Sequence, residues 1–195
     1  MLVAQNVPRY RLLSSYRAVL ADNFYLSAFV AGGAMRIVAS LIAQSILILR
    51  GLQGAVSPVA ILHLTFLGAT VGGLGNAAWY RLLDESLGRL GVSARADGTT
   101  QARIRDVILK TTLSYCVWAP VCNSAYLLAM PLLRGEPLAL ALANVRAQFL
   151  IVMGLELACF MPYNLFAFRA IPLSLRAPIQ SCVACVFSVG LALMA

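Results

Sequence analysis

Residues 26–49 read LSAFVAGGAMRIVASLIAQSILIL, an apolar run with one charged residue. A run of this composition indicates that the chain lies in a lipid bilayer. About 20 helical residues cross the hydrocarbon core of a bilayer, which is about 30 Å thick. Runs of similar length and composition follow at residues 59–83, 109–133, 148–168 and 178–195. The chain therefore contains five candidate transmembrane segments.

The composition agrees with a membrane protein. Hydrophobic residues make up 61% of the chain and charged residues 11%, whereas soluble domains carry about 25% charge. In lipid the backbone must satisfy its own hydrogen bonds, so the segments are helices or strands of a closed barrel. The runs lack alternation and several are too long for barrel strands. We expect an all-α integral membrane protein, a bundle of four to five transmembrane helices in a single domain over residues 1–195. Whether both of the last two runs span stays open.

The first 23 residues predict an amphipathic helix that lies in the membrane interface. Apolar and aromatic side chains recur there every three or four residues, with arginines between them: Tyr10, Leu13, Tyr16, Leu20 and Phe24. Such a helix can bind the bilayer surface. The same composition is similar to a mitochondrial targeting peptide, and both interpretations stay open.

The charge distribution predicts the orientation. The chain has 15 basic and 7 acidic residues, a net charge of +8. Basic residues gather before the first run and in a predicted loop at residues 84–105: Arg9, Arg11, Arg17, Arg89, Arg95, Arg103 and Arg105. By the positive-inside rule, these two regions share the cytoplasmic, matrix or stromal side. No basic stripe with exposed aromatic residues indicates a nucleic-acid partner.

A polar stripe lies inside the first run. Arg36, Ser40 and Gln44 recur every four residues and so share one helix face. An arginine at mid-membrane costs about 2.5–3.5 kcal/mol unless it is paired or hydrated. Glu156 is the acidic residue at comparable depth and our candidate partner. We therefore expect either a polar pathway or a buried ion pair, with Lys110 as a further candidate; backbone carbonyls of a kinked helix are another possible partner for Arg36.

The second run has a small-residue face and an aromatic end. Gly68, Gly72 and Gly75 lie on one side, which lets another helix approach closely. Trp79 and Tyr80 precede an arginine near the end of the run, a pattern typical of an interfacial anchor.

The sequence predicts no enzyme. It contains no paired carboxylates, no nucleophile beside a base, no phosphate-binding glycine loop and no zinc spacing. We accordingly expect no catalytic residues, no cofactor and no metal site.

Several motifs follow the order seen in a known family. The matching positions are Tyr16, Leu20, Ser27, 41–44, Gly68, Gly73, 79–84, Lys110, Pro120, Gly135, Phe168, 171–172 and Arg176, of which WYRLLD at 79–84 is the most specific. The chain resembles the small integral membrane proteins of mitochondria and peroxisomes that include Mpv-seventeen and the peroxisomal membrane protein of twenty-two kilodaltons. It departs from their pattern where Ser40, Leu74, 114–115, Phe160 and Phe187 replace the family's aspartate, proline, Asp-Gln and tryptophans.

The resemblance implies an organellar membrane protein, in some members similar to a pore or a small-solute channel in organelle homeostasis. The mitochondrial inner membrane is the expected compartment, with a peroxisomal or plastid membrane as the alternative. The competing function is that of an accessory or structural subunit of a large respiratory or photosynthetic complex. Expected partners are the lipid bilayer and either other membrane subunits or further copies of the chain.

Overall fold

The computed structural model describes residues 22–89 and 100–194; for residues 191–194 it describes the backbone only. All its regular elements are helices: α2 (Phe24–Leu49), α3 (Pro58–Leu67), η1 (Gly68–Gly75), α4 (Asn76–Arg89), α5 (Thr100–Leu113), η2 (Ser114–Trp118), α6 (Ala119–Leu133), α7 (Leu138–Ala170) and α8 (Leu173–Met194). The segments η1 and η2 are π-helical. Because they are continuous with their neighbours, α3–η1–α4 and α5–η2–α6 form two long helices.

Five helices in the described part are long and apolar enough to cross a membrane: Phe24–Leu49, Pro58–Arg89, Thr100–Leu133, Leu138–Ala170 and Leu173–Gly190. This confirms the predicted all-α membrane fold, and both of the last two runs form helices that are long and apolar enough to span. The predicted interfacial helix of residues 1–23 lies almost wholly outside the described residues.

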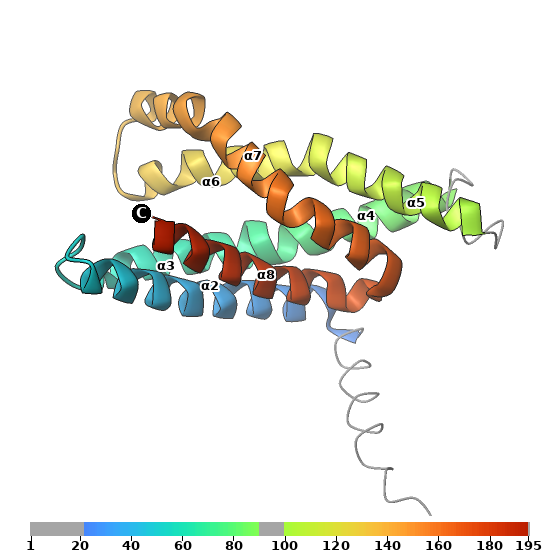
Figure 1. The fold of residues 1–195 in the computed structure, drawn as a ribbon, viewed down its shortest axis with the longest axis horizontal. Coiled ribbons are helices and arrows are strands. Elements are labelled where there is room, and N and C mark those ends of the chain that lie inside the picture. The colour runs from blue at the N-terminus through green and yellow to red at the C-terminus, as the bar shows by residue number, and fades with distance from the viewer. Residues whose placement is uncertain (1–21, 90–99, 195) are drawn as a thin grey trace, which may run out of the picture.

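The helices alternate in direction between two ends of an elongated bundle (Figure 1). One end, here called the ion-pair end, contains the start of α2, the end of α4, the start of α5 and the α7–α8 turn. The other, here called the hollow end, contains the α2–α3 and α6–α7 connections and the C-terminus of α8. Gly51 and Gly135 have positive φ angles of 72° and 81° in those two connections, a conformation that glycine adopts without strain.

The predicted loop at residues 84–105 is shorter than expected. Helix α4 continues to Arg89, and α5 begins at Thr100. Charged residues stabilise these extensions through pairs four positions apart, Arg81 with Glu85 and Asp106 with Lys110. A helix needs apolar residues only where lipid surrounds it. Helix ends predicted from hydropathy therefore fall short of the ends in the structure, since the charged turns outside the lipid are also helical.

The tightest packing lies between α2 and η1. A Cβ atom added at Gly32 would lie 2.9 Å from the Cα atom of Gly73, and one added at Gly73 would lie 3.1 Å from the Cα atom of Phe29. Small residues therefore let two backbones touch, as small-residue faces do in membranes. Helix α8 packs along α2 on another side, and α7 packs on α6.

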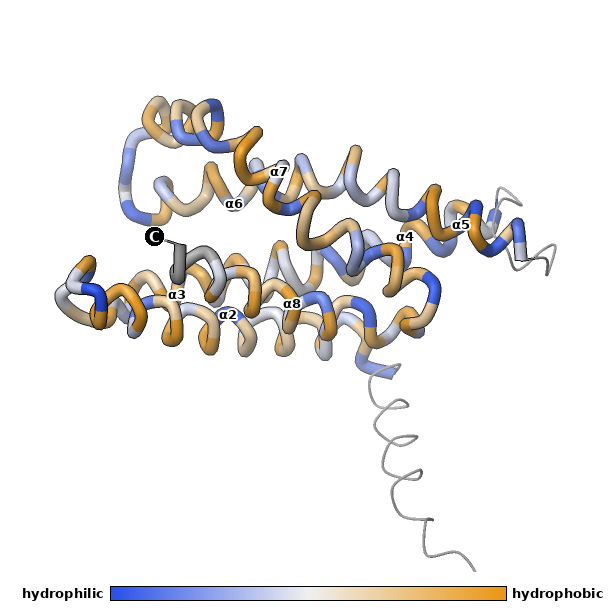
Figure 2. The backbone as a smooth tube through the Cα atoms, viewed as in Figure 1, coloured by the Kyte–Doolittle hydropathy of each residue, from blue (hydrophilic) through white to orange (hydrophobic). Residues whose placement is uncertain are grey.

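Large apolar side chains cover the outside of the bundle. Leu150, Val186 and Leu62 are 79%, 73% and 67% exposed, and Figure 2 shows apolar residues along much of the length of the helices. A water-soluble protein rarely exposes such continuous apolar surface. The outer surface is suited to lipid.

Candidate functional site

A cavity of about 210 Å³ lies at the centre of the bundle, where all five long helices contribute to its wall. Its wall includes both π-helical segments, which are rare and frequently occur at functional sites. The polar side chains that line it are Arg36, Asn76, Asn123, Glu156, Gln180, Ser181 and Ser188. Polar side chains from all five long helices therefore meet at the centre of the bundle.

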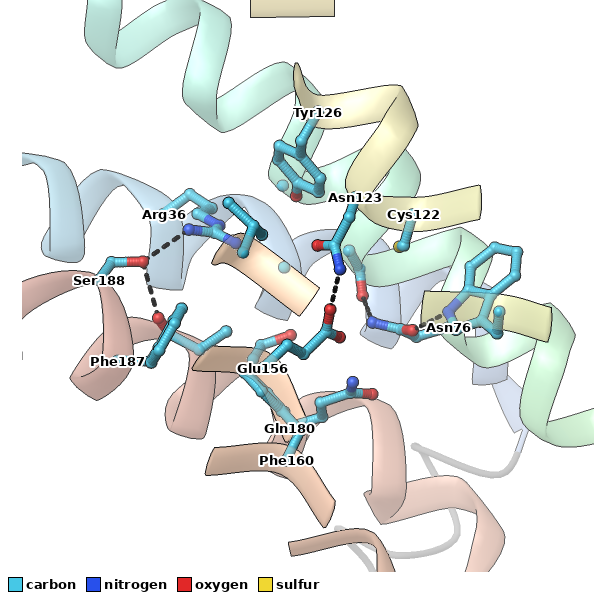
Figure 3. A pocket seen from close by; sticks show the side chains of 17 residues that line it. Arg36, Asn76, Cys122, Asn123, Tyr126, Glu156, Phe160, Gln180, Phe187 and Ser188 are labelled. Carbon is cyan, nitrogen blue, oxygen red and sulfur yellow. Dashed lines mark hydrogen bonds between the residues drawn. The ribbon is translucent and has the colours of Figure 1, made fainter. Parts of the chain in front are cut away.

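Arg36 lies on one side of this central cavity. Its Nη1 donates a 2.7 Å hydrogen bond to Ser188 Oγ, and its guanidinium lies 5.2 Å from the centre of the Tyr126 ring (Figure 3). Tyr126 in turn donates to the carbonyl of Leu67 at 3.0 Å. A Cβ at Gly68 would lie 2.8 Å from the Cβ of Arg36, so this glycine makes room for the arginine.

Glu156 lies on another part of the wall. Its carboxylate accepts a hydrogen bond from the amide of Asn123. Among the described residues, no ion pair joins Arg36 to a carboxylate. Arg36 and Glu156 therefore line the same cavity but do not form the direct ion pair that we expected. Arg36 binds Ser188 and Glu156 binds Asn123, because the rotation of each helix directs the two side chains to different neighbours.

The two remaining glycines of the predicted face also accommodate large side chains. A Cβ at Gly72 would lie 3.0 Å from the Tyr126 hydroxyl, and one at Gly75 would lie 2.9 Å from the Trp118 ring. Trp118 donates to Asn76 and stacks on Trp79 with ring centres 5.7 Å apart. The glycine face of the second helix therefore contacts α2, α6 and η2, not a single partner helix.

Trp79 and Tyr80 lie inside the bundle, in contrast to the interfacial position that we expected. Trp79 donates to Ser114 Oγ at 3.0 Å. Tyr80 is 2% exposed; its hydroxyl donates to Gln180 Oε1 at 2.7 Å and lies 3.3 Å from Asn164 Oδ1. Both residues lie on the face of α4 that also contains the buried residues Asn76 and Leu83, and this face is turned toward the core. Between these aromatic rings and Glu156 only about 20 Å³ of space remains.

A cluster of four buried charges closes the ion-pair end. Asp84 lies 2.7 Å from Lys110 Nζ and 3.2 Å from Arg176 Nη1, and Lys110 lies 2.9 Å from Asp106. Their side chains are between 7% and 12% exposed. Lys110, a candidate pore residue from the sequence, is thus neutralised here by two aspartates.

Sequence reasoning missed Asp84, Asp106 and Arg176 as members of this ion cluster. The four-residue spacing of Asp106 and Lys110 on one helix was a usable signal. No local signal connects Asp84 with Arg176, which are 92 positions apart.

A larger hollow of about 510 Å³ adjoins the central cavity on the side of the hollow end. Arg36 and Ser188 line both spaces, and Ser40, Gln44, Gln53, Ser57 and Arg134 line only the larger one. Gln44 accepts hydrogen bonds from Gln53 Nε2 at 3.0 Å and from the Ser57 amide at 2.6 Å, and it donates to Ser40 Oγ at 3.1 Å. The polar stripe of α2 therefore faces this hollow and holds the α2–α3 connection in place.

No group of three or more potential metal ligands occurs among residues 22–89 and 100–194.

Comparison with known protein families shows that residues 131–192 match the Mpv17 / PMP22 family. The matched region includes Glu156, Arg176, Gln180 and Ser188, whereas Arg36, Asp84 and Lys110 precede it. No curated protein and no solved structure gives a significant match. The C-terminal third of the chain is thus similar to the Mpv17 / PMP22 family, and the five long apolar helices are those of a membrane protein.

Proposed function

We propose that this protein is a passage for small polar solutes or ions across an organellar membrane, and that the central cavity holds the solute in transit. The observation that carries this proposal is the cavity of about 210 Å³ at which polar side chains from all five long helices meet. A conducting path needs a polar or hydrated lining. Polar side chains at membrane depth are costly and frequently mark such paths.

The surroundings of the cavity are asymmetric, which suits a passage that is closed on one side. Toward the hollow end, the space beside Arg36 continues to Gln53 and Arg134. A further hollow lies between α6 and α7. Asn123 and Tyr126 line both this hollow and the central cavity, and the hollow extends to Arg134 and Glu136 at the same end. Toward the ion-pair end, the Tyr80 hydrogen bonds, the tryptophan stack and the ion cluster fill the bundle.

Conductance of the purified, folded protein in planar bilayers tests the proposal. Val152 lines the central cavity, whereas Leu150, two positions earlier on the same helix, is 79% exposed. We expect Val152→Phe to reduce conductance by filling the cavity and Leu150→Phe to leave it unchanged. Equal conductance of both variants contradicts a path through this cavity. No conductance, combined with tight co-migration in a larger membrane complex, favours an accessory subunit instead.

We further propose the mitochondrial inner membrane as the compartment, with the ion-pair end facing the matrix. Described basic residues near that end include Arg81, Arg89, Arg103, Arg105 and Arg169. Positive residues in short loops remain on the side from which the protein is inserted. Subcellular fractionation tests the compartment. Single cysteines introduced at Arg89 and Arg134, labelled from each side, test the orientation; labelling of both from one side contradicts it.

A further inference from the structure

Arg36 differs from the other cations buried in the bundle. Lys110 and Arg176 both contact carboxylates. Arg36 contacts the Ser188 hydroxyl and the face of Tyr126, and no carboxylate of the described residues pairs with it. A guanidinium has five N–H donors; Nη1 of Arg36 binds Ser188, and Tyr126 is the other polar side chain in contact with the guanidinium. Arg36 lines two adjoining spaces, and its charge has no carboxylate partner among the described residues there.

A second arginine extends this positive region. Arg134 follows the last turn of α6 and lines the same hollow as Arg36. Among the described residues, it too has no ion-pair partner. Arginine binds carboxylate and phosphate groups through paired N–H donors and holds them more specifically than lysine does. The route from the hollow end to the cavity therefore offers two successive positions to an oxyanion.

Glu156 provides the opposite chemistry on the same cavity wall. Its carboxylate receives one hydrogen bond, from Asn123, and the Gln180 and Asn76 side chains lie on the same wall. An ionised carboxylate only accepts hydrogen bonds. It therefore favours a ligand that presents a hydroxyl or an ammonium group and disfavours a second anionic group at this position.

We propose that the central cavity binds a small oxyanion that also carries a hydrogen-bond donor. The carboxylate or phosphate group contacts Arg36 beside Ser188, and a hydroxyl or ammonium group of the same molecule contacts Glu156. This inference rests on the proposed passage, since it names the class of solute that dwells there. The space of about 210 Å³ limits the ligand to a compact molecule.

Equilibrium binding by calorimetry, with the full chain in nanodiscs of phosphatidylcholine, tests the site. Three probes separate its two halves: glycerol 3-phosphate, propyl phosphate without hydroxyls, and glycerol without phosphate. We expect saturable binding of glycerol 3-phosphate, binding of propyl phosphate that is about tenfold weaker because it lacks the charge-assisted hydrogen bond to Glu156, and no binding of glycerol. Equal binding of the two phosphates overturns the role of Glu156.

Variants at Arg36 test the oxyanion half. We expect Arg36→Gln to weaken glycerol 3-phosphate binding at least tenfold and Arg36→Lys to weaken it less, since lysine retains the charge but loses the paired donors. Arg103→Gln, at an exposed position of α5, is the matched control. Thermal unfolding confirms that each variant is folded. Undiminished binding by folded Arg36→Gln overturns the proposal.

An anionic lipid headgroup shares this chemistry and is a second source of the ligand. Nanodiscs with phosphatidylglycerol separate the two sources. Arg36-dependent thermal stabilisation by phosphatidylglycerol, without binding of glycerol 3-phosphate, supports the oxyanion site and assigns it to a headgroup. Binding without conductance supports the site and contradicts the passage. Conductance without Arg36-dependent binding or stabilisation contradicts the site and supports the passage.

Discussion

The two regions that contain buried basic side chains differ in how the positive charge is paired. At the ion-pair end, Lys110 and Arg176 share Asp84, and Asp106 completes a cluster of two positive and two negative charges. At the central cavity, Arg36 has a hydroxyl and an aromatic ring as neighbours, and the carboxylate of Glu156 points to Asn123. A fully paired cluster stabilises one arrangement of helices, whereas a cation without a carboxylate remains able to receive a mobile anion. This difference suggests that one end is structural and that the centre is functional.

The largest effect is expected from Asp84→Asn. The substitution removes the carboxylate shared by Lys110 and Arg176, and breaking a buried pair costs about 3–5 kcal/mol. Unfolding in mixed detergent micelles measures the loss of stability. Glu85→Gln is the matched control, because Glu85 pairs with Arg81 at the surface, where both side chains are about half exposed, and we expect little change there. Similar losses for the two variants contradict a structural role of the cluster.

A smaller loss is expected from Gly68→Ala, which tests how the Arg36 position is built. The added methyl group would lie 2.8 Å from the Arg36 Cβ and 2.9 Å from the Gly32 carbonyl oxygen. Overpacking of this kind costs about 1–3 kcal/mol, and we expect it to weaken anion binding as well. Gly154→Ala is the control on α7, since nothing lies near its added Cβ. A neutral Gly68→Ala variant with normal binding contradicts the packing described here.

Tyr80→Phe tests the boundary between the two regions. It removes the hydroxyl bonded to Gln180, at a cost of about 1 kcal/mol. If Tyr80 helps to close the passage, the variant conducts more than the native protein in planar bilayers. Tyr25→Phe, at a 41% exposed position of α2, is the control and should conduct normally. Equal conductance of both variants places the closure elsewhere.

The smallest expected effect is the coupling between Arg36 and Glu156. Because the structure shows no ion pair between them, we expect the losses of stability in Arg36→Met and Glu156→Gln to add within about 0.5 kcal/mol. Arg36→Met and Ser188→Ala remove groups in direct contact, and such pairs couple by about 0.5 kcal/mol or more. A double-mutant cycle for each pair measures the difference. Strong coupling between Arg36 and Glu156 contradicts the separate contacts seen in the structure and supports the direct ion pair expected from the sequence.

The sequence by itself determined the membrane fold and part of the cavity wall. Helix length and apolarity depend on consecutive residues, so the five helices could be recognised without knowledge of their neighbours. The period of the helix also placed Arg36, Ser40 and Gln44 on one face, and the structure shows that face lining one hollow. The small residues of the second run likewise indicated close packing before any partner was known.

The tertiary structure alone decided which side chains meet. Asp84 contacts Arg176 across 92 positions of sequence, Tyr80 turns inward to Gln180, and Arg36 contacts Ser188 on α8. These contacts depend on how each helix rotates about its axis and slides along its neighbours. Rotation and offset follow from packing of side chains such as Gly32 against Gly73, which lie on different helices. Periodicity within one helix contains no information on that match, so the ion cluster and the unpaired state of Arg36 emerged only when all five helices were packed together.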